Sequence, residues 1–259
     1  MGSVRLLKKL FGKDVRIMEL SSVQLRLTNS LHKQFPDEPL GGTVLSSISG
    51  MKGERISFQA LISLPEEAPR GRVMVEISSP GLQEFHLRRV ISVPVRLAAF
   101  YDKSDDNYLR KSPGLYPDLL TEYRGEPFWL NEGESVSFWA DTELVEEGEY
   151  PVVFRVRSAD GAPGEAEILE AALTVTVVNA VLPEQKLMCT QWFHSDCLAD
   201  YYHVPVFSEE YWEIVERFMR SAVSCGINMI LTPTFTPALD TAVGRERTTV
   251  QLVEVTLRP

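Results

Sequence analysis

The pattern that most restricts the fold of this chain lies between residues 189 and 232. A buried strand around Cys189 leads into a polar and aromatic loop that ends near Tyr202. A helical pattern follows over residues 208–224, and a second buried-strand pattern follows over residues 227–232. Two strands connected through a helix form a parallel pair, as in the first turn of a (β/α) barrel. The loop after such a strand lies at the end of the barrel where ligands bind.

The helix in this unit has clear signals at both ends. Ser208 is a suitable N-cap, and Glu209 and Glu210 place negative charge in the first turn, where the helix dipole favours it. Gly226 fits the position that follows the C-cap. Spacing of three and four residues predicts one apolar face, formed by Trp212, Val215, Phe218, Met219 and Val223.

Residues 21–180 show a two-residue period instead. Apolar and polar residues alternate over residues 22–28, 55–62 and 72–78, which predicts strands with one buried and one solvated face. Further strands are expected within residues 85–100, 135–140, 149–157 and 168–178, with turn-forming residues between them. We therefore predict a mainly β fold: an N-terminal β-sandwich followed by the first β/α unit of an incomplete TIM-type barrel.

The predicted domains are a leader over residues 1–20, the β-sandwich over residues 21–180, and an N-terminal fragment of a (β/α)8 barrel over residues 181–259. The leader mixes basic and apolar residues without the continuous apolar core of a secretory signal, and we expect it to be poorly ordered. Pro183 interrupts the strand pattern at the boundary between sandwich and barrel.

One segment of the sandwich half, residues 101–130, is predicted to be a long loop. It is rich in aromatic residues: Tyr108, Tyr116, Tyr123, Phe128 and Trp129. Long loops in compact domains usually have a function, and the aromatic content argues against disorder. Two interpretations remain open: the loop packs against the neighbouring domain, or it binds a ligand.

Composition excludes several classes of protein. A net charge of −10 and a pI of about 5.0 argue against nucleic-acid binding, and no apolar run is long enough to span a membrane. Three cysteines, Cys189, Cys197 and Cys225, do not form a disulfide framework, so a cytoplasmic protein with reduced thiols is expected. The spacing of Cys189, His194, Asp196 and Cys197 is poor for zinc, and we expect neither metal nor cofactor.

Several stretches together resemble glycoside hydrolase family 123-like proteins. KGERISFQ (52–59), GLYPDLL (114–120) and LPEQ (182–185) are similar to the N-terminal β-sandwich of that family. TQWFHSDCLADYY (190–202), NMILTPTFTP (228–237) and Leu239-Asp240 are similar to the start of its catalytic barrel. The chain departs from the family at Leu119, where a further proline often follows Tyr-Pro-Asp.

The resemblance implies a retaining β-N-acetylgalactosaminidase, whose partner is a glycan with a terminal N-acetylhexosamine. In such enzymes the substrate's acetamido oxygen is the nucleophile, an Asp orients it, and the adjacent Glu acts as acid and base. No position here matches that pair, since Asp37-Glu38 lies in the sandwich half. We therefore expect an N-terminal fragment that is inactive alone and self-associates through its incomplete barrel. The alternative is a non-catalytic carbohydrate-binding or structural β-sandwich module.

The candidate substrate-binding residues follow the two predicted barrel strands. They are Trp192, His194, Asp196, Asp200 and Tyr202 after the first strand, and Thr232 and Asp240 after the second. Aromatic faces stack on pyranose rings, while carboxylates, hydroxyls and imidazole hydrogen-bond to sugar hydroxyls. The competing interpretation is that Trp192 and Phe193 belong to the core and the remaining residues only solvate the loop. No catalytic residue is assigned within the chain.

Overall fold

The computed structural model describes residues 18–98, 106–160 and 167–232. These residues belong to two compact units, Met1–Leu182 and Pro183–Pro259, and each unit is described by itself. The predicted boundary after residue 180 falls close to the division between them. No helix within the described ranges is both long and apolar enough to cross a bilayer.

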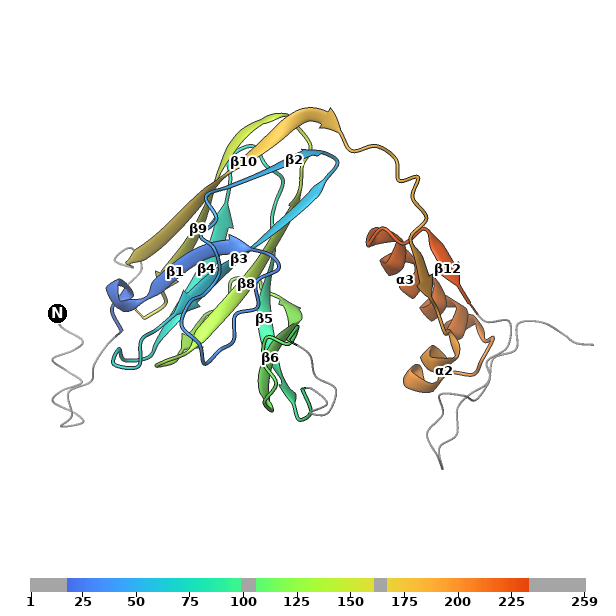
Figure 1. Cartoon of the computed structure of the whole chain (residues 1–259), viewed down its shortest axis with the longest axis horizontal. Helices are drawn as coiled ribbons and strands as arrows, with labels where there is room; N and C mark the ends of the chain where they lie inside the picture. The colour runs from blue at the N-terminus through green and yellow to red at the C-terminus, as the bar shows by residue number, and fades with distance from the viewer. Residues whose placement is uncertain (1–17, 99–105, 161–166, 233–259) are drawn as a thin grey trace, which may run out of the picture. The chain divides into compact units, whose positions relative to one another are not determined.

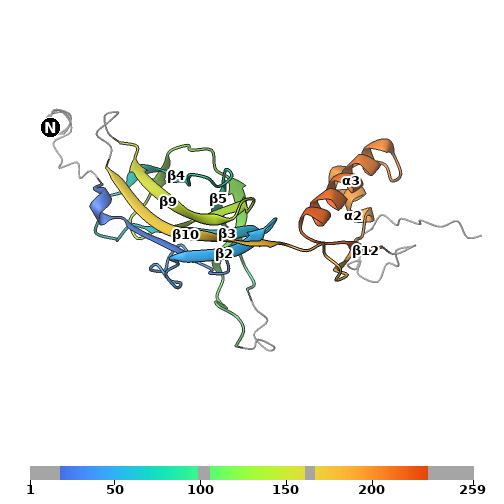
Figure 2. The ribbon, with the colours of Figure 1, turned by 90° about the horizontal axis from the view of Figure 1, so that it is seen from above.

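The first unit contains two five-stranded sheets, which Figures 1 and 2 show as two layers. The first sheet has the order β1 (Gln24–Asn29), β3 (Arg55–Ser63), β8 (Ser135–Glu143), β5 (His86–Val95) and β6 (Gly114–Glu122). The second sheet has the order β2 (Ser47–Lys52), β10 (Ile168–Val181), β9 (Gly148–Ser158), β4 (Gly71–Ser78) and β7 (Phe128–Leu130). Neighbouring strands are antiparallel except for β2 and β10, which are parallel.

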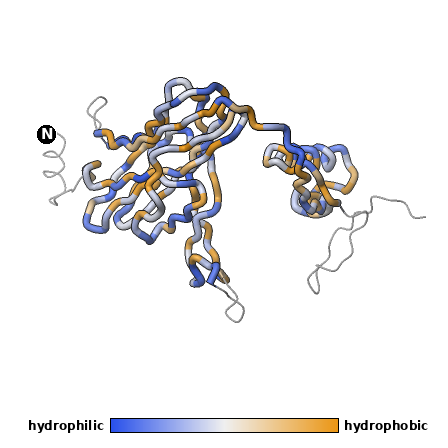
Figure 3. The backbone as a smooth tube through the Cα atoms, turned by 45° about the horizontal axis from the view of Figure 1, so that its top comes forward, coloured by the Kyte–Doolittle hydropathy of each residue, from blue (hydrophilic) through white to orange (hydrophobic). Residues whose placement is uncertain are grey.

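A single core fills the space between the two sheets. Phe58 and Phe138 enter it from the first sheet, and Phe154 and Val175 enter it from the second, all fully buried. The period-two pattern produces this arrangement because alternate side chains of a strand point to opposite faces. Figure 3 shows hydrophobic and hydrophilic positions interleaved along these strands. A mainly β fold is therefore confirmed.

The N-terminal edge of the sandwich extends further than predicted. Met18 and Leu20 are buried in the core, and Leu20–Ser22 form the short 3-10 helix η1. The Leu20 amide donates to a carboxylate oxygen of Glu167 at 2.9 Å. Met18 and Leu20 therefore belong to the core of the sandwich rather than to a poorly ordered leader, while Glu19 between them is exposed. Residues 1–17 lie outside the described part of the chain.

The prediction of one long loop over residues 101–130 was wrong. Residues 114–122 form β6, an edge strand that pairs with β5, and residues 128–130 form β7. Pro117 concealed β6 in the sequence, since proline lacks the amide that a central strand needs. An edge strand tolerates it, and the pairing with β5 shifts register between Ile91 and Ser92.

The second unit contains two short parallel strands joined through two helices. β11 (Thr190–Trp192) leads into α2 (Asp196–Tyr202), α3 (Glu209–Ser224) and β12 (Met229–Leu231). The two strands pair in parallel, with Thr190 beside Met229 and Trp192 beside Leu231. Within residues 183–232, the structure contains two strands, β11 and β12. Completion of a barrel beyond them stays a prediction.

The capping signals of α3 are confirmed by the structure. The Ser208 hydroxyl accepts a hydrogen bond from the Tyr211 amide at 3.2 Å, and Glu209 and Glu210 occupy the first turn. Gly226 follows the C-cap with φ of +83°, a conformation that glycine adopts without steric cost. The helix therefore begins and ends where the sequence predicted.

The predicted apolar face of α3 was only partly right. The buried residues are Tyr211, Ile214 and Val215, which pack with Leu198 and Ala199 of α2. The other four residues of the predicted face, Trp212, Phe218, Met219 and Val223, are exposed. The apolar residues of α3 form one broad face, so spacing alone could not show which part of that face α2 covers.

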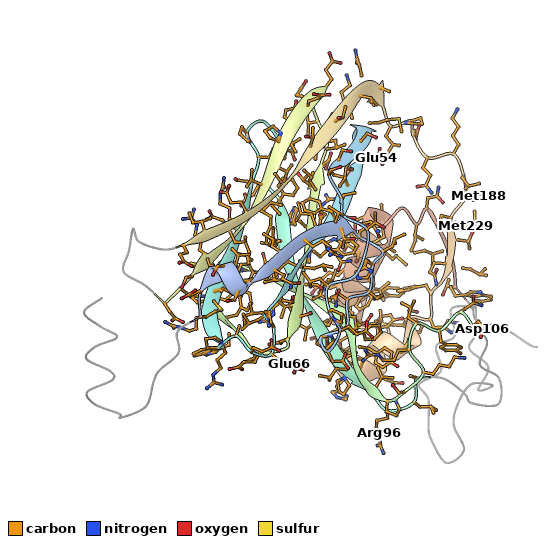
Figure 4. The ribbon with its side chains drawn as sticks, turned by 60° about the vertical axis from the view of Figure 1, so that its left-hand side comes forward. Glu54, Glu66, Arg96, Asp106, Met188 and Met229 are labelled. Carbon is orange, nitrogen blue, oxygen red and sulfur yellow. The ribbon has the colours of Figure 1, made fainter. Side chains whose placement is uncertain are left out.

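Two further predictions in this unit need correction. Residues 189–202 are not one loop, because residues 196–202 form α2, a helix too short to show a clear period in the sequence. Cys189 is exposed rather than buried, since it precedes β11 and the whole run of residues 181–192 is exposed. The thioethers of Met188 and Met229, labelled in Figure 4, are exposed near the amino-terminal ends of both strands.

Candidate functional site

The carboxyl-terminal edge of β11 and β12 brings the two predicted groups of site residues together. The Phe193 amide donates to the Leu231 carbonyl at 2.9 Å, directly after the Trp192–Leu231 pair. Thr232 follows Leu231, so it leaves the sheet at the same edge as Phe193. The parallel pairing causes this proximity, since parallel strands end at the same edge.

Trp192 and His194 form an aromatic pair at this edge. Their ring centroids are 6.0 Å apart with an interplanar angle of 30°. Trp192 is 62% exposed, so the interpretation that it belongs to the core was wrong. Its neighbour Phe193 instead packs on the small core of the second unit. Strand alternation explains the difference, because consecutive side chains point to opposite faces.

Helix α2 positions the candidate residues that follow His194 in the chain. The Cys197 thiol donates to the His194 carbonyl at 2.6 Å, which holds the turn before the helix. Leu198 and Ala199 are buried, while Asp200 lies on the exposed side. The helix ends at His203, which has a left-handed backbone with φ of 57° and donates its amide to the Ala199 carbonyl.

Tyr202 lies at the α2–α3 contact rather than at the strand edge. Its ring makes an edge-on contact with Phe218 of α3 at a centroid distance of 6.3 Å and another with Tyr201 at 5.0 Å. The structure therefore groups Trp192, His194 and Thr232 at one edge, with Asp200 and Tyr202 on the neighbouring helix. Asp196 begins α2, and Asp240 lies outside the described residues.

In the part of the chain that the structure describes, the candidate metal-binding side chains do not converge on one point. Within the described ranges, no group of three or more His, Cys, Asp or Glu side chains is placed to hold a metal ion. The three cysteines are exposed and unpaired with one another. Cys197 is engaged with a backbone carbonyl, an arrangement that does not activate a thiol.

The sandwich has a cleft that the sequence analysis missed. It has a volume of about 840 Å³, and its walls are residues 84–88 and the end of β6, including Leu120, Glu122, Tyr123 and Arg124. Residues 114–122 were expected to form part of a loop, so their pairing with β5 was not predicted. Residues 114–122 show no regular alternation, since Leu119 and Leu120 are adjacent apolar residues, so a two-residue period could not reveal this strand.

Three charged side chains that line this cleft, Arg88, Glu122 and Arg124, form ion pairs. Glu122 accepts from Arg124 at 2.6 Å, and this guanidinium lowers the pKa of the Glu122 carboxyl. Arg88 contacts the buried carboxylate of Asp141, which Arg55 also contacts at 2.7 Å. These ion pairs engage Arg88, Glu122 and Arg124, while Glu84 also lines the cleft.

Most aromatic residues of the 101–130 segment serve the sandwich itself. Tyr123 and Phe128 are core residues, and the ring of Tyr116 packs edge-on against Phe35 at 5.4 Å. Trp129 is exposed and lies under the guanidinium of Arg70, 5.2 Å from the ring centroid. Packing within the unit thus explains this aromatic content better than a shared ligand surface does.

The comparisons with known proteins agree with the resemblance found in the sequence. Residues 192–258 match the model of the glycoside hydrolase 123 catalytic domain. A solved family 123 glycoside hydrolase from Clostridium perfringens, described in a study of glycolipid glycan hydrolysis, is similar in fold with a TM-score of 0.61 and 12% identity. The similarity covers 80% of this chain and 37% of that one, so this chain spans well under half of that enzyme's length.

Other solved structures are only weakly similar to this chain. The N-terminal domain of PorA matches with a TM-score of 0.30 and 10% identity, covering 61% of this chain and 99% of that chain. A PapD-like domain of human CEP192 matches with a TM-score of 0.30 and 12% identity, covering 61% of this chain and 87% of that chain. No curated protein gives a significant match. The resemblance to family 123 glycoside hydrolases is confirmed.

Proposed function

We propose that this chain supplies the β-sandwich and the first β/α unit of a family 123-like glycoside hydrolase. The match to the catalytic-domain model carries this proposal, because it begins at Trp192, the last residue of β11. That residue stands at the carboxyl-terminal strand edge, where barrel enzymes bind their substrates. The proposed substrate is a glycan with a terminal N-acetylhexosamine, such as the glycan of a glycolipid, and the proposed activity is that of a retaining β-N-acetylgalactosaminidase.

The proposed sugar contacts follow from the chemistry at this edge. The exposed indole of Trp192 stacks on the apolar face of a pyranose, and His194 and Thr232 hydrogen-bond to its hydroxyls. Asp196, Asp200, Tyr202 and Asp240 complete the candidate set as further polar contacts. These residues would form one wall of the substrate site.

The chain does not contain the groups that the family's chemistry needs. The one Asp-Glu dipeptide in the sequence is Asp37-Glu38, and both carboxylates contact Arg110 in the sandwich, at 2.9 Å and 2.5 Å. The hydrogen bond from Arg110 lowers the pKa of Asp37, and both carboxylates are held in ion pairs of the sandwich rather than at the end of a barrel strand. We therefore assign no catalytic residue here and propose that the chain alone does not hydrolyse its substrate.

The sandwich is proposed to be a scaffold rather than a carbohydrate-binding module. The packing of Tyr116, Tyr123 and Phe128 inside the unit supports this role. Trp129 is the exception, because its indole is exposed. It therefore provides a matched control for Trp192 in a binding experiment.

Two measurements test the proposal on the purified chain. An aryl β-N-acetylgalactosaminide should not be turned over above a buffer control, and turnover that is lost on His194→Ala or Asp196→Ala would show an active enzyme. In saturation-transfer NMR, N-acetylgalactosamine should bind weakly, with a Kd on the order of 1 mM or above. Trp192→Ala should remove the signal and Trp129→Ala should retain it. Loss with Trp129→Ala alone would instead identify the sandwich as the binding module.

A further inference from the structure

Tyr201 of helix α2 is an exposed aromatic side chain outside the proposed set of sugar contacts. It is 78% exposed, more than any other phenylalanine, tyrosine or tryptophan in the part of the chain that the structure describes. A single exposed ring does not by itself mark a binding site. What Tyr201 can bind therefore depends on how its ring is supported and on where it lies relative to the end of β11.

The ring of Tyr201 is supported by neighbouring rings and by the end of its helix. Tyr201 and Tyr202 meet edge-on at a centroid distance of 5.0 Å, and Tyr202 meets Phe218 of α3 edge-on at 6.3 Å. His203, directly after the two tyrosines, ends the helix with a left-handed backbone, φ 57° and ψ 41°. This conformation costs free energy in a residue with a Cβ atom, so the surrounding packing holds it. A ring fixed in this way loses little conformational entropy when a ligand binds.

Tyr201 lies on the side of α2 that begins at His194. Ser195 already has helical backbone angles, φ −71° and ψ −18°, so the helical turn starts directly after His194. Steps of three and four residues lead from His194 to Cys197 and on to Tyr201, which places the three residues in one row. The hydrogen bond from the Cys197 thiol to the His194 carbonyl, at 2.6 Å, closes the first step. Seven residues of helical rise make this row about 10 Å long.

We propose that Tyr201 binds the group attached to the anomeric carbon of the terminal N-acetylhexosamine, an inference that rests on the proposed function. A sugar at the non-reducing end of a glycan is linked to the rest only through its anomeric carbon. Trp192 and His194 are the proposed contacts of that terminal sugar, so the next unit of the glycan follows the row from His194 toward Tyr201. The phenol ring stacks on the apolar face of this second unit.

The neighbouring side chain supplies the polar part of this contact. Asp200 lies on the exposed side of α2 directly before Tyr201, and a carboxylate accepts several hydrogen bonds from sugar hydroxyls. An aromatic face beside a hydrogen-bond acceptor suits a pyranose, which has both an apolar face and hydroxyl groups. The substrate class is therefore a glycan or glycoside whose leaving group begins with a ring.

Two glycosides that differ only in the leaving group test this contact. Methyl β-N-acetylgalactosaminide has no second ring, whereas phenyl β-N-acetylgalactosaminide has one. In ligand-observed NMR titrations of the full chain, the phenyl glycoside should bind roughly two- to tenfold more tightly, the range expected for one aromatic contact. Tyr201→Ala should remove this difference, so that both glycosides bind alike. A β-linked disaccharide with N-acetylgalactosamine at its non-reducing end should behave like the phenyl glycoside.

Two control variants separate the ring of Tyr201 from general effects of tyrosine removal. Tyr201→Phe keeps the ring and should retain the preference, as should Tyr108→Ala, which removes an exposed tyrosine of the sandwich. Equal binding of both glycosides by the original chain, or a preference that survives Tyr201→Ala, would overturn the inference and leave the proposed function standing. Absence of binding for both glycosides would instead refute the proposed function, and this inference with it.

Discussion

The hydrogen bond between Tyr123 and Val75 links the two sheets of the sandwich. Tyr123 follows β6 and is only 7% exposed. Its hydroxyl accepts a hydrogen bond from the Val75 amide of β4 at 3.1 Å. The ring lies edge-on to Phe138 at a centroid distance of 5.1 Å and to Phe128 at 6.2 Å. Tyr123→Phe keeps the ring contacts and removes only the acceptor of a buried amide.

The expected loss of stability in Tyr123→Phe follows from the burial of the Val75 amide. Val75 is 4% exposed and its amide points away from β9, so loss of the hydroxyl leaves a buried donor without this partner. An unsatisfied buried donor costs about 1–3 kcal/mol. Tyr150→Phe is the matched control, because its hydroxyl lies among exposed carbonyls of Glu146 and Glu147 and should change stability by less than about 0.5 kcal/mol.

The same tyrosine contributes a dependence on alkaline pH. Burial raises the pKa of Tyr123 above its usual value of 10. The folded state therefore retains this proton while the unfolded state releases it, so the stabilisation is present below pH 10 and is lost as pH rises through the folded pKa. Tyr123→Phe should lack this part of the alkaline loss, whereas Tyr150→Phe should retain it.

Urea titration followed by tryptophan fluorescence measures both effects. Every protein compared in this titration carries Trp192→Phe and Trp212→Phe. The remaining tryptophans, Trp129 and Trp139, both lie in the sandwich and report its unfolding. The midpoint should fall at unchanged slope, since the surface exposed on unfolding stays the same. A loss below about 0.5 kcal/mol at pH 7, or an alkaline profile identical to the original, would refute the role of this hydrogen bond.

Two further changes test the sheet and the helix. Asp141→Asn removes the buried carboxylate between Arg55 and Arg88 and should lower the free energy of unfolding by about 1–3 kcal/mol. This loss is smaller than that expected for a fully buried ion pair, because both guanidinium groups reach solvent. The same urea titration measures it, and an unchanged midpoint would contradict the structural role of this ion pair. Ser208→Ala removes the N-cap of α3 and should cost about 1 kcal/mol of local stability. Thermal melting of the circular dichroism signal at 222 nm should then begin earlier, whereas coincident melting curves would argue against the cap.

Local signals in the sequence predicted the elements whose formation depends on local chemistry. Alternation located β1, β3 and β4, because a half-buried strand needs period two whatever its partners are. Ser208 and Gly226 located the ends of α3, because capping acts within one helical turn. β2 was missed, since its serine and glycine content resembles a turn and its pairing partner β10 lies more than a hundred residues away.

The features of the candidate site also fall into those that the sequence determined and those that depend on tertiary packing. The sequence by itself determined that a strand, a helix and a second strand follow one another after residue 187, and that polar and aromatic residues follow each strand. The tertiary structure alone decided that Trp192 is exposed, that Tyr202 turns to Phe218, and that Trp212 and Met219 stay uncovered. Which side of a strand or helix becomes buried depends on the element packed against it, and residue order does not specify that element.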